Sequence, residues 1–139
     1  MILILEDNNG RILEMHNCLH GITEFKIVRR VDEFILFYTE NANKIIGISL
    51  DHDLEKSDPN ESDPGDGRDV VKWMCDNSIR LPVVIHTSNS IMGDSMYFNL
   101  IDNGNSIDRI DPYDDLVWIR QSWIQKVINH FNLMKCPTR

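Results

Sequence analysis

Short apolar runs alternate with segments of helical periodicity from one end of the chain to the other. The runs are continuously apolar rather than alternating, which is typical of strands in a parallel sheet that is covered on both faces. Polar turn residues follow each of them. Five strands are predicted in this way, at Met1 to Leu5, Phe25 to Val28, Ile45 to Leu50, Pro82 to Ile85 and Ser106 to Ile110.

Between these strands, apolar residues recur at the three-to-four residue spacing of amphipathic helices. Gly21 and Gly104 are suitable helix stops, and Asp32 is a candidate N-cap. The predicted helices carry Ile12 to Leu19, Phe34 to Tyr38, Val70 to Cys75, Ile91 to Ile101 and, from Asp114 onward, Leu116 to Phe131.

Strands that alternate with helices pair in parallel through right-handed crossovers. The pattern predicts an α/β fold, a three-layer sandwich of the flavodoxin-like kind, formed by residues 1–139 as a single domain. The expected strand order is 2-1-3-4-5. In that order the ligand crevice lies where the carboxyl ends of the first and third strands meet.

Composition narrows the function classes. The 139 residues are 42% hydrophobic, which is enough for one core, and the formal net charge of -8 argues against general binding to nucleic acid or anionic lipid. No apolar run is long enough to span a membrane, and no secretory signal is visible. Three widely spaced cysteines fit reduced thiols, so a cytoplasmic protein is expected.

Chemically active side chains gather where three of the predicted strands end. Glu6 and Asp7 follow the first strand, Asp51-His52-Asp53 follows the third, and His86-Thr87-Ser88-Asn89 follows the fourth. Because parallel strands end at the same edge of a sheet, these groups are expected to form one site.

With those residues, the chain resembles the receiver domains of two-component systems over nearly its full length. The family has an acidic pair after strand one, a phospho-accepting Asp after strand three and a Ser or Thr after strand four. These correspond to Glu6 with Asp7, to Asp51, and to Thr87 or Ser88. The family's Lys-Pro after strand five is replaced by Ile110-Asp111-Pro112, and Arg109 is the nearest cation in the sequence.

The chain is more similar to the cyclic-phosphate-processing receiver-like group, which is associated by prediction with phage and bacterial conflict systems that handle nucleotide signals. Three motifs carry this resemblance. They are Leu5-Glu6-Asp7-Asn8 with Arg11-Ile12, Ser49 to Leu54, and Val84 to Asn89 followed by Met96.

The acids suggest a divalent metal site. Glu6, Asp7, Asp51 and Asp53 offer hard oxygen ligands that suit Mg²⁺ or Mn²⁺, and a cation relieves the repulsion among them. Two alternatives stay open. Glu6 and Asp7 are also suitable for the start of a helix, and Asp51 is also suitable as a nucleophile.

His52 and His86 distinguish this chain from an ordinary receiver. An imidazole at a strand end transfers protons near neutral pH, which makes either one a candidate catalytic acid beside Asp51. A structural role, with the ring hydrogen-bonded to the backbone, is the alternative for each.

Phosphate binding is expected from Thr87, Ser88 and Asn89 at the start of the following helix, together with Arg11 and Arg109. The same three polar residues are also suited to helix capping. The acidic segment Glu55 to Gly67 is either a lid or a solvated loop. The three tryptophans are expected in the core or at an interface, with Trp118 a weak candidate for stacking on a nucleobase.

Two functions follow from these residues and resemblances. The first is a metal-dependent phosphoesterase that acts on a cyclic nucleotide or related cyclic phosphate. The second is a non-catalytic nucleotide-binding protein or degenerate receiver signalling module. Either takes a small phosphorylated ligand, and a homodimer is conceivable because receiver-like domains often pair.

Overall fold

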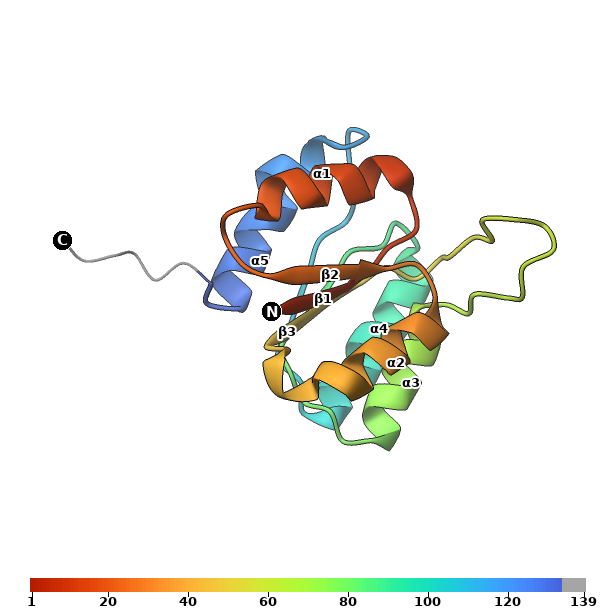
Figure 1. The fold of residues 1–139 in the computed structure, drawn as a ribbon. Helices are drawn as coiled ribbons and strands as arrows, with labels where there is room; N and C mark the ends of the chain where they lie inside the picture. Colours follow the sequence, from red (N-terminus) through yellow and green to blue (C-terminus); the bar gives the residue numbers. More distant parts are fainter. Residues whose placement is uncertain (134–139) are drawn as a thin grey trace.

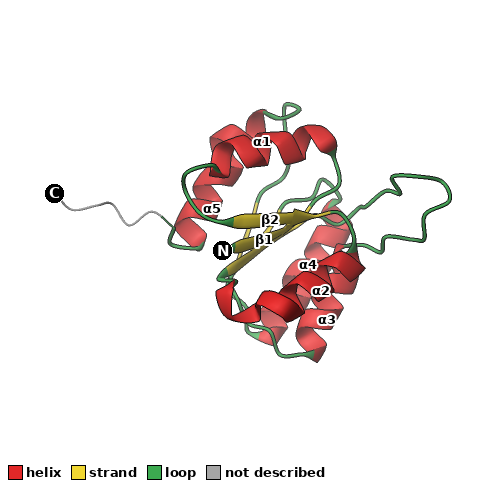
Figure 2. Ribbon diagram, in the orientation of Figure 1, coloured by secondary structure: helices red, strands yellow, loops and turns green. Residues whose placement is uncertain are grey.

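A computed structural model describes residues 1–133 of the chain. Its centre is one parallel five-stranded sheet in the order β2-β1-β3-β4-β5, which confirms the predicted topology (Figure 2). The strands are β1 (Ile2–Leu5), β2 (Phe25–Val28), β3 (Gly47–Leu50), β4 (Val83–Ile85) and β5 (Ile107–Arg109).

Helices cover both faces of the sheet, as expected of parallel strands joined by crossovers. In Figure 1, α1 and α5 lie on one face, and α2, α3 and α4 lie on the other. These elements are α1 (Asn9–Leu19), α2 (Val31–Asn41), the 3₁₀ turn η1 (Ala42–Lys44), α3 (Gly67–Asp76), α4 (Ser90–Asn103), the π-helical turn η2 (Ile119–Trp123) and α5 (Ile124–His130).

Each face of the sheet has its own apolar cluster, because successive strand side chains point to opposite faces. Leu3 and Leu5 of β1 pack with α2, α3 and α4 around the fully buried Phe34. Ile2 and Ile4 pack on the other face, with α1 and the C-terminal helical segment.

Two predicted helix starts are wrong. Arg30, not Asp32, occupies the N-cap of α2, and Asp32 lies in the first turn, where its carboxylate pairs with Arg30. Asp114 and Asp115 have φ of 48° and 54°, the left-handed region, so no helix begins there. Helical structure starts at Val117 and continues through η2 into α5.

Asn8, Asp66 and Asn89 are the caps that form. Each side chain accepts a backbone N–H in the first turn of α1, α3 or α4.

No helix within residues 1–133 has the length and apolarity to cross a membrane. Cys18 and Cys75 are free thiols, and Cys136 lies outside the described residues.

Candidate functional site

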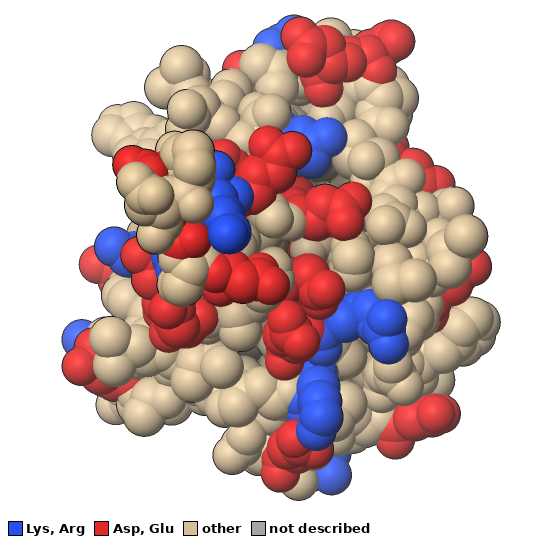
Figure 3. Space-filling view, turned by 90° about the vertical axis from the view of Figure 1, so that its right-hand side faces the viewer, with Lys and Arg blue, Asp and Glu red and all other residues tan. Residues whose placement is uncertain are grey.

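The predicted acidic residues meet at the carboxyl edge of the sheet. Glu6 and Asp7 follow β1, and Asp51 follows the adjacent β3. Figure 3 shows this side of the molecule, with acidic side chains gathered across its middle and a few basic ones among them. The crevice expected between the first and third strands is therefore the place where these carboxylates lie.

Glu6 is fully buried, and its carboxylate is held on both oxygens. Oε2 accepts the backbone N–H groups of Asp7 and Asn8, each at 3.0 Å, and Oε1 lies 3.2 Å from Nε2 of His86. Burial alone favours the neutral acid, but the contact with His86, the backbone N–H of Asn8 and the charge of Arg11 together hold the pKa of Glu6 below its ordinary value. Glu6 is thus a carboxylate at neutral pH.

Behind Glu6, a chain of polar contacts runs through the α1 and α5 face of the sheet. The indole N–H of Trp123 donates to Ser49 Oγ at 3.0 Å, and Ser49 Oγ lies 2.7 Å from Nδ1 of His86. An indole N–H only donates, so Ser49 accepts from Trp123; its own O–H has no other acceptor within residues 1–133 and is directed to Nδ1. We therefore assign the His86 proton to Nε2, facing Glu6.

This arrangement contradicts the expectation that His86 protonates a substrate. The side chain is fully buried, and Nε2 lies 3.2 Å from Glu6 Oε1, a close contact of ion-pair length that lacks hydrogen-bond geometry; Nε2 makes no hydrogen bond within residues 1–133. Without His86, the buried charge of the Glu6 carboxylate would lose its nearest partner. His86 therefore stabilises Glu6 in its ionised form and fixes its position.

Asp51 is also buried, but it is poorly compensated. Oδ1 accepts the backbone N–H of His52 at 2.7 Å, and Oδ2 lies 3.7 Å from Nη1 of Arg11. Burial, and then the negative charge of Glu6, raise the pKa of Asp51 to about 8. Burial likewise raises the pKa of Asp7. Asp51 therefore carries a proton at neutral pH unless a cation replaces it.

Glu6, Asp7 and Asp51 suit a divalent cation. One oxygen from each lies within 4.8 Å of the others. Neighbouring oxygens around Mg²⁺ lie about 3 Å apart and opposite ones about 4.2 Å, so small side-chain movements complete the set. Burial and then the charge of Glu6 raise the pKa of Asp51, and a bound cation would offset both by favouring the carboxylate. Asp53, the fourth predicted ligand, is not in this group.

Arg11 is the cation of the site. Nη1 lies 3.6 Å from Glu6 Oε1, and the guanidinium stacks on Trp118 at 5.3 Å from the ring centre. Its side-chain N–H groups make no hydrogen bond to any residue of 1–133, so its donors are available to an anion. Trp118 itself is fully buried, and the interpretation that it stacks on a nucleobase is wrong.

A cavity of about 200 Å³ joins these groups. It is lined by Glu6, Asp7, Asn8, Arg11, Asp51, Asp53, Glu55 and Ser88. Six of the predicted site residues thus line one small polar space, and Ser88 is an exposed hydroxyl on its rim.

His52 points away from this cavity, toward the start of α3. Its Nδ1 lies 2.8 Å from Asp53 Oδ1, and its Nε2 lies 3.6 Å from Asp66 Oδ2. Gly67 lets α3 begin this close, because a Cβ there would meet the carbonyl oxygen of Asp51 at 2.1 Å. Asp53, which lines the cavity, is the connection between His52 and the site.

The remaining predicted phosphate ligands are occupied elsewhere. Thr87 is buried, and its hydroxyl accepts the N–H of Asn89 at 3.1 Å. Asn89 caps α4, so capping is the role that forms. Arg109 is directed to α4, with hydrogen bonds to Asp94 at 2.6 Å and to the carbonyl of Ser90 at 3.1 Å, and it lines neither this cavity nor the one beside it.

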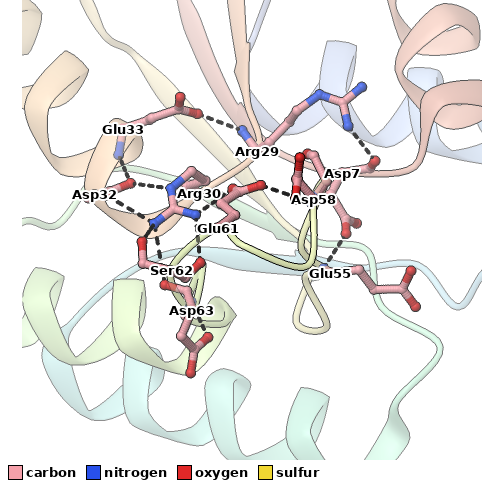
Figure 4. Close-up of polar contacts among 12 residues, drawn as sticks. Asp7, Arg29, Arg30, Asp32, Glu33, Glu55, Asp58, Glu61, Ser62 and Asp63 are labelled. Atoms are coloured by element: carbon pink, nitrogen blue, oxygen red, sulfur yellow. Dashed lines mark hydrogen bonds and ion pairs between the residues drawn. The ribbon is translucent and has the colours of Figure 1, made fainter.

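The acidic loop after β3 extends outward from the sheet edge (Figure 1), and only its first residue, Glu55, lines the cavity. Figure 4 shows how it is fastened. Arg30 contacts Glu61, Ser62 and the carbonyl of Asp63, and the N–H of Glu55 donates to Asp7. In this conformation the loop is tied to α2 and is not a lid.

Ser49 and Trp123 are the contributors that the sequence interpretation left without a role. Strand alternation could have found them. Ser49 pairs with Ile4 and Val84, whose side chains pack on the α1 and α5 face. Glu6 and His86 come two residues after Ile4 and Val84, just past the ends of β1 and β4. Period two thus places Glu6, Ser49 and His86 on one face, beside Trp123.

Solved structures confirm the fold. The phosphorylated cyanobacterial phytochrome response regulator RcpA is 22% identical, with a TM-score of 0.72 over 99% of this chain and 97% of that one. The Mn²⁺-bound response regulator Rcp1 is 21% identical, with a TM-score of 0.67 over the same shares. The non-phosphorylated HemR receiver domain of Leptospira biflexa is 16% identical, with a TM-score of 0.68 over 99% and 98%.

No curated protein matches the chain. The family described as the cyclic-phosphate processing receiver domain matches residues 1–102, a segment that contains β1 to β4, Arg11 and all three clustered carboxylates. The chain therefore belongs to the cyclic-phosphate processing receiver domain family.

Proposed function

We propose that this protein is a metal-dependent phosphoesterase that opens a cyclic phosphate. One observation carries the proposal: the carboxylate cluster shares a small cavity with Arg11, a cation whose hydrogen-bond donors are unused within residues 1–133. Cation-binding oxygens and a guanidinium that face one space are suited to a phosphate bound between them.

Each side chain has a separate task in this proposal. Glu6, Asp7 and Asp51 hold Mg²⁺ or Mn²⁺, and Arg11 binds the non-bridging phosphate oxygens. His86 acts through Glu6 as a positioning residue, and His52 acts in the same way through Asp53. Ser88 lies on the rim of the cavity and lines it, so its hydroxyl is placed to contact the ligand.

A bound divalent cation would neutralise phosphate charge and lower the pKa of a water molecule. Ring opening consumes one water. Its oxygen forms a new bond to phosphorus, one ring P–O bond breaks with its electron pair going to the leaving oxygen, and that oxygen gains one of the water's protons. Arg11 stabilises the extra negative charge that gathers on the phosphate oxygens as this happens.

The test is incubation of the purified protein with cyclic mononucleotides, cyclic dinucleotides and 2′,3′-cyclic phosphates, each with Mg²⁺, Mn²⁺ or EDTA. Products are separated by chromatography and identified by mass. We expect cation-dependent gain of one water on one substrate class, with a loss of at least 100-fold in Asp51→Ala and in Arg11→Ala.

Asp102→Ala is the matched control, because Asp102 is an exposed carboxylate on α4 that does not line the cavity. It should keep the wild-type rate. Unchanged substrates throughout the panel, with the protein folded and cation bound, would refute the esterase.

A second candidate is a receiver that accepts a phosphoryl group on Asp51. It is favoured by the position of this carboxylate at the end of β3, where one oxygen lies free in the cavity beside Arg11. Exposure to acetyl phosphate with Mg²⁺ would then add one phosphoryl group, measured as intact mass, and Asp51→Asn would prevent the addition.

A further inference from the structure

A second cavity adjoins the acidic one. Its volume is about 300 Å³, and it shares Asn8, Arg11 and Ser88 with the first. Its other lining residues are consecutive, Pro112 to Leu116, in the loop between β5 and η2. A ligand with its phosphate at Arg11 therefore has a neighbouring space for the rest of its structure.

Apolar and aromatic groups form part of the second cavity. The Tyr113 hydroxyl is engaged with Ser122 Oγ at 2.7 Å and with Gln121 Oε1 at 3.3 Å, which anchors the side chain to η2. Because the hydroxyl is already used, the ring is what Tyr113 offers to a ligand, beside Pro112 and Leu116. An anchored ring with apolar neighbours is suited to stacking on a planar group.

Two carboxylates complete the wall. Asp114 and Asp115 are consecutive non-glycine residues with positive φ, an uncommon backbone conformation that fixes where the loop carries them. Carboxylates accept hydrogen bonds from hydroxyl and amino groups and repel anions. This part of the cavity is thus suited to a neutral group with hydrogen-bond donors, and it disfavours a second phosphate.

We propose that the second cavity, formed by Tyr113, Asp114, Asp115 and Leu116, binds the nucleoside part of a ligand whose single phosphate lies at Arg11. Its volume is at the lower end of the roughly 300–1,000 Å³ of small-molecule sites. The ligand class is then a mononucleoside phosphate rather than a cyclic dinucleotide, whose second phosphate would face Asp114 and Asp115. This inference rests on the proposed function only for the position of the phosphate.

Calorimetry on the Mg²⁺-loaded protein tests it with three probes: inorganic phosphate, adenosine 5′-monophosphate and adenosine 3′,5′-bisphosphate. We expect the monophosphate to bind at least tenfold more tightly than inorganic phosphate, and the bisphosphate no more tightly than the monophosphate. Tyr113→Ala should bring the monophosphate to within twofold of inorganic phosphate, whose own affinity is unchanged.

Conservative variants keep the test interpretable. Tyr113→Phe retains the ring and should retain the monophosphate affinity. Asp114→Asn and Asp115→Asn preserve side-chain size, since Asn also tolerates positive φ, and should strengthen bisphosphate binding at least threefold. Asp102→Asn on α4 is the control and should change none of the three affinities.

The inference is overturned if inorganic phosphate and the monophosphate bind equally, if the monophosphate does not bind, or if Tyr113→Ala leaves its affinity unchanged. These outcomes are separable from those of the proposed function. If the protein binds the monophosphate through Tyr113 but opens no cyclic phosphate, the nucleoside subsite is supported and the esterase function is refuted. If ribose 2′,3′-cyclic phosphate and its nucleoside counterpart are turned over equally, the esterase function is supported and the nucleoside subsite is refuted.

Discussion

Two halves of one site treat their carboxylates in opposite ways. In the closed half, made of Trp123, Ser49, His86 and Glu6, the polar contacts pass from one side chain to the next and end on a buried carboxylate. In the open half, made of Asp7, Asp51 and Arg11, the carboxylates face a cavity; each accepts one backbone N–H, and Arg11 lies 3.7 Å from Asp51.

The difference shows in the pKa directions. The pKa of Glu6 is lowered although the residue is fully buried, whereas the pKa of Asp51, only slightly more exposed, is raised to about 8. Burial acts on both in the same direction, so the partners decide. In the closed half, the protein's own contacts stabilise the charge of Glu6. In the open half, Asp51 requires a bound cation to be ionised at neutral pH.

The largest expected effect comes from breaking the closed half. His86→Leu leaves Oε1 of the buried Glu6 carboxylate without its nearest partner, which should reduce the free energy of unfolding by about 3–5 kcal/mol. Urea denaturation followed by circular dichroism measures the loss. Glu6→Gln combined with His86→Leu should recover part of it, because the double variant carries no buried charge.

His20→Leu serves as the control for that change, since His20 is an exposed residue at the end of α1. It should alter the unfolding free energy by no more than about 0.5 kcal/mol. Equal losses for the His86 and His20 variants would contradict the assigned role of the closed half.

A second expected effect is a pH dependence that belongs to the open half. In metal-free protein the folded-state pKa of Asp51 is about 8, above its unfolded value of about 3.9. The folded state then binds more protons between these values, so stability is highest at the acidic end and falls as pH rises toward 8, by at most about 1.4 kcal/mol per pH unit.

Asp51→Asn removes this titration and should be more stable than the wild type by about 1–3 kcal/mol at pH 8 in EDTA, with a clearly smaller difference at pH 5. Saturating Mg²⁺ should stabilise the wild type at pH 8 and leave Asp51→Asn nearly unaffected. Urea titrations at both pH values give the measurement. Parallel pH profiles for the two proteins would contradict the prediction, and Asp102→Asn should follow the wild type.

The smallest expected effect sharpens the closed half. Ser49→Ala leaves the buried Trp123 N–H without its acceptor and His86 Nδ1 without its donor, which should cost about 1–2 kcal/mol of unfolding free energy. The ¹⁵N shifts of His86 should report a proton on Nε2 in the wild type and a mixture of tautomers in Ser49→Ala. A proton on Nδ1 in the wild type would reverse the assigned direction.

Most of the fold could be predicted from the sequence because it depends on local pattern. Continuous apolar runs gave five strands, and the helices between them required parallel crossovers and the observed strand order. The acidic cluster followed from the topology, since Glu6 and Asp51 end neighbouring strands. Element ends were less predictable where an unusual backbone decided them, as at Asp114 and Asp115.

The direction of each histidine was not predicted. His52 and His86 follow strands at the same edge, yet strand alternation turns His52 toward α3 and His86 behind Glu6, so neither lines the acidic cavity. Arg109 was equally misleading, because closeness in sequence to β5 says nothing of its contact with Asp94. The two histidine directions follow from strand period, which motif spacing alone does not give, whereas the direction of Arg109 depends on its tertiary neighbours.

The aromatic neighbours of the site give the protein an intrinsic optical signal. Trp118 lies beneath the Arg11 guanidinium and stacks on the His86 ring at 6.1 Å between centroids, so an event at either partner changes the surroundings of an indole. Trp73 packs against Phe34 and Tyr38 on the opposite face of the sheet and supplies an internal reference. Intrinsic fluorescence can therefore follow occupancy of this site in unlabelled protein.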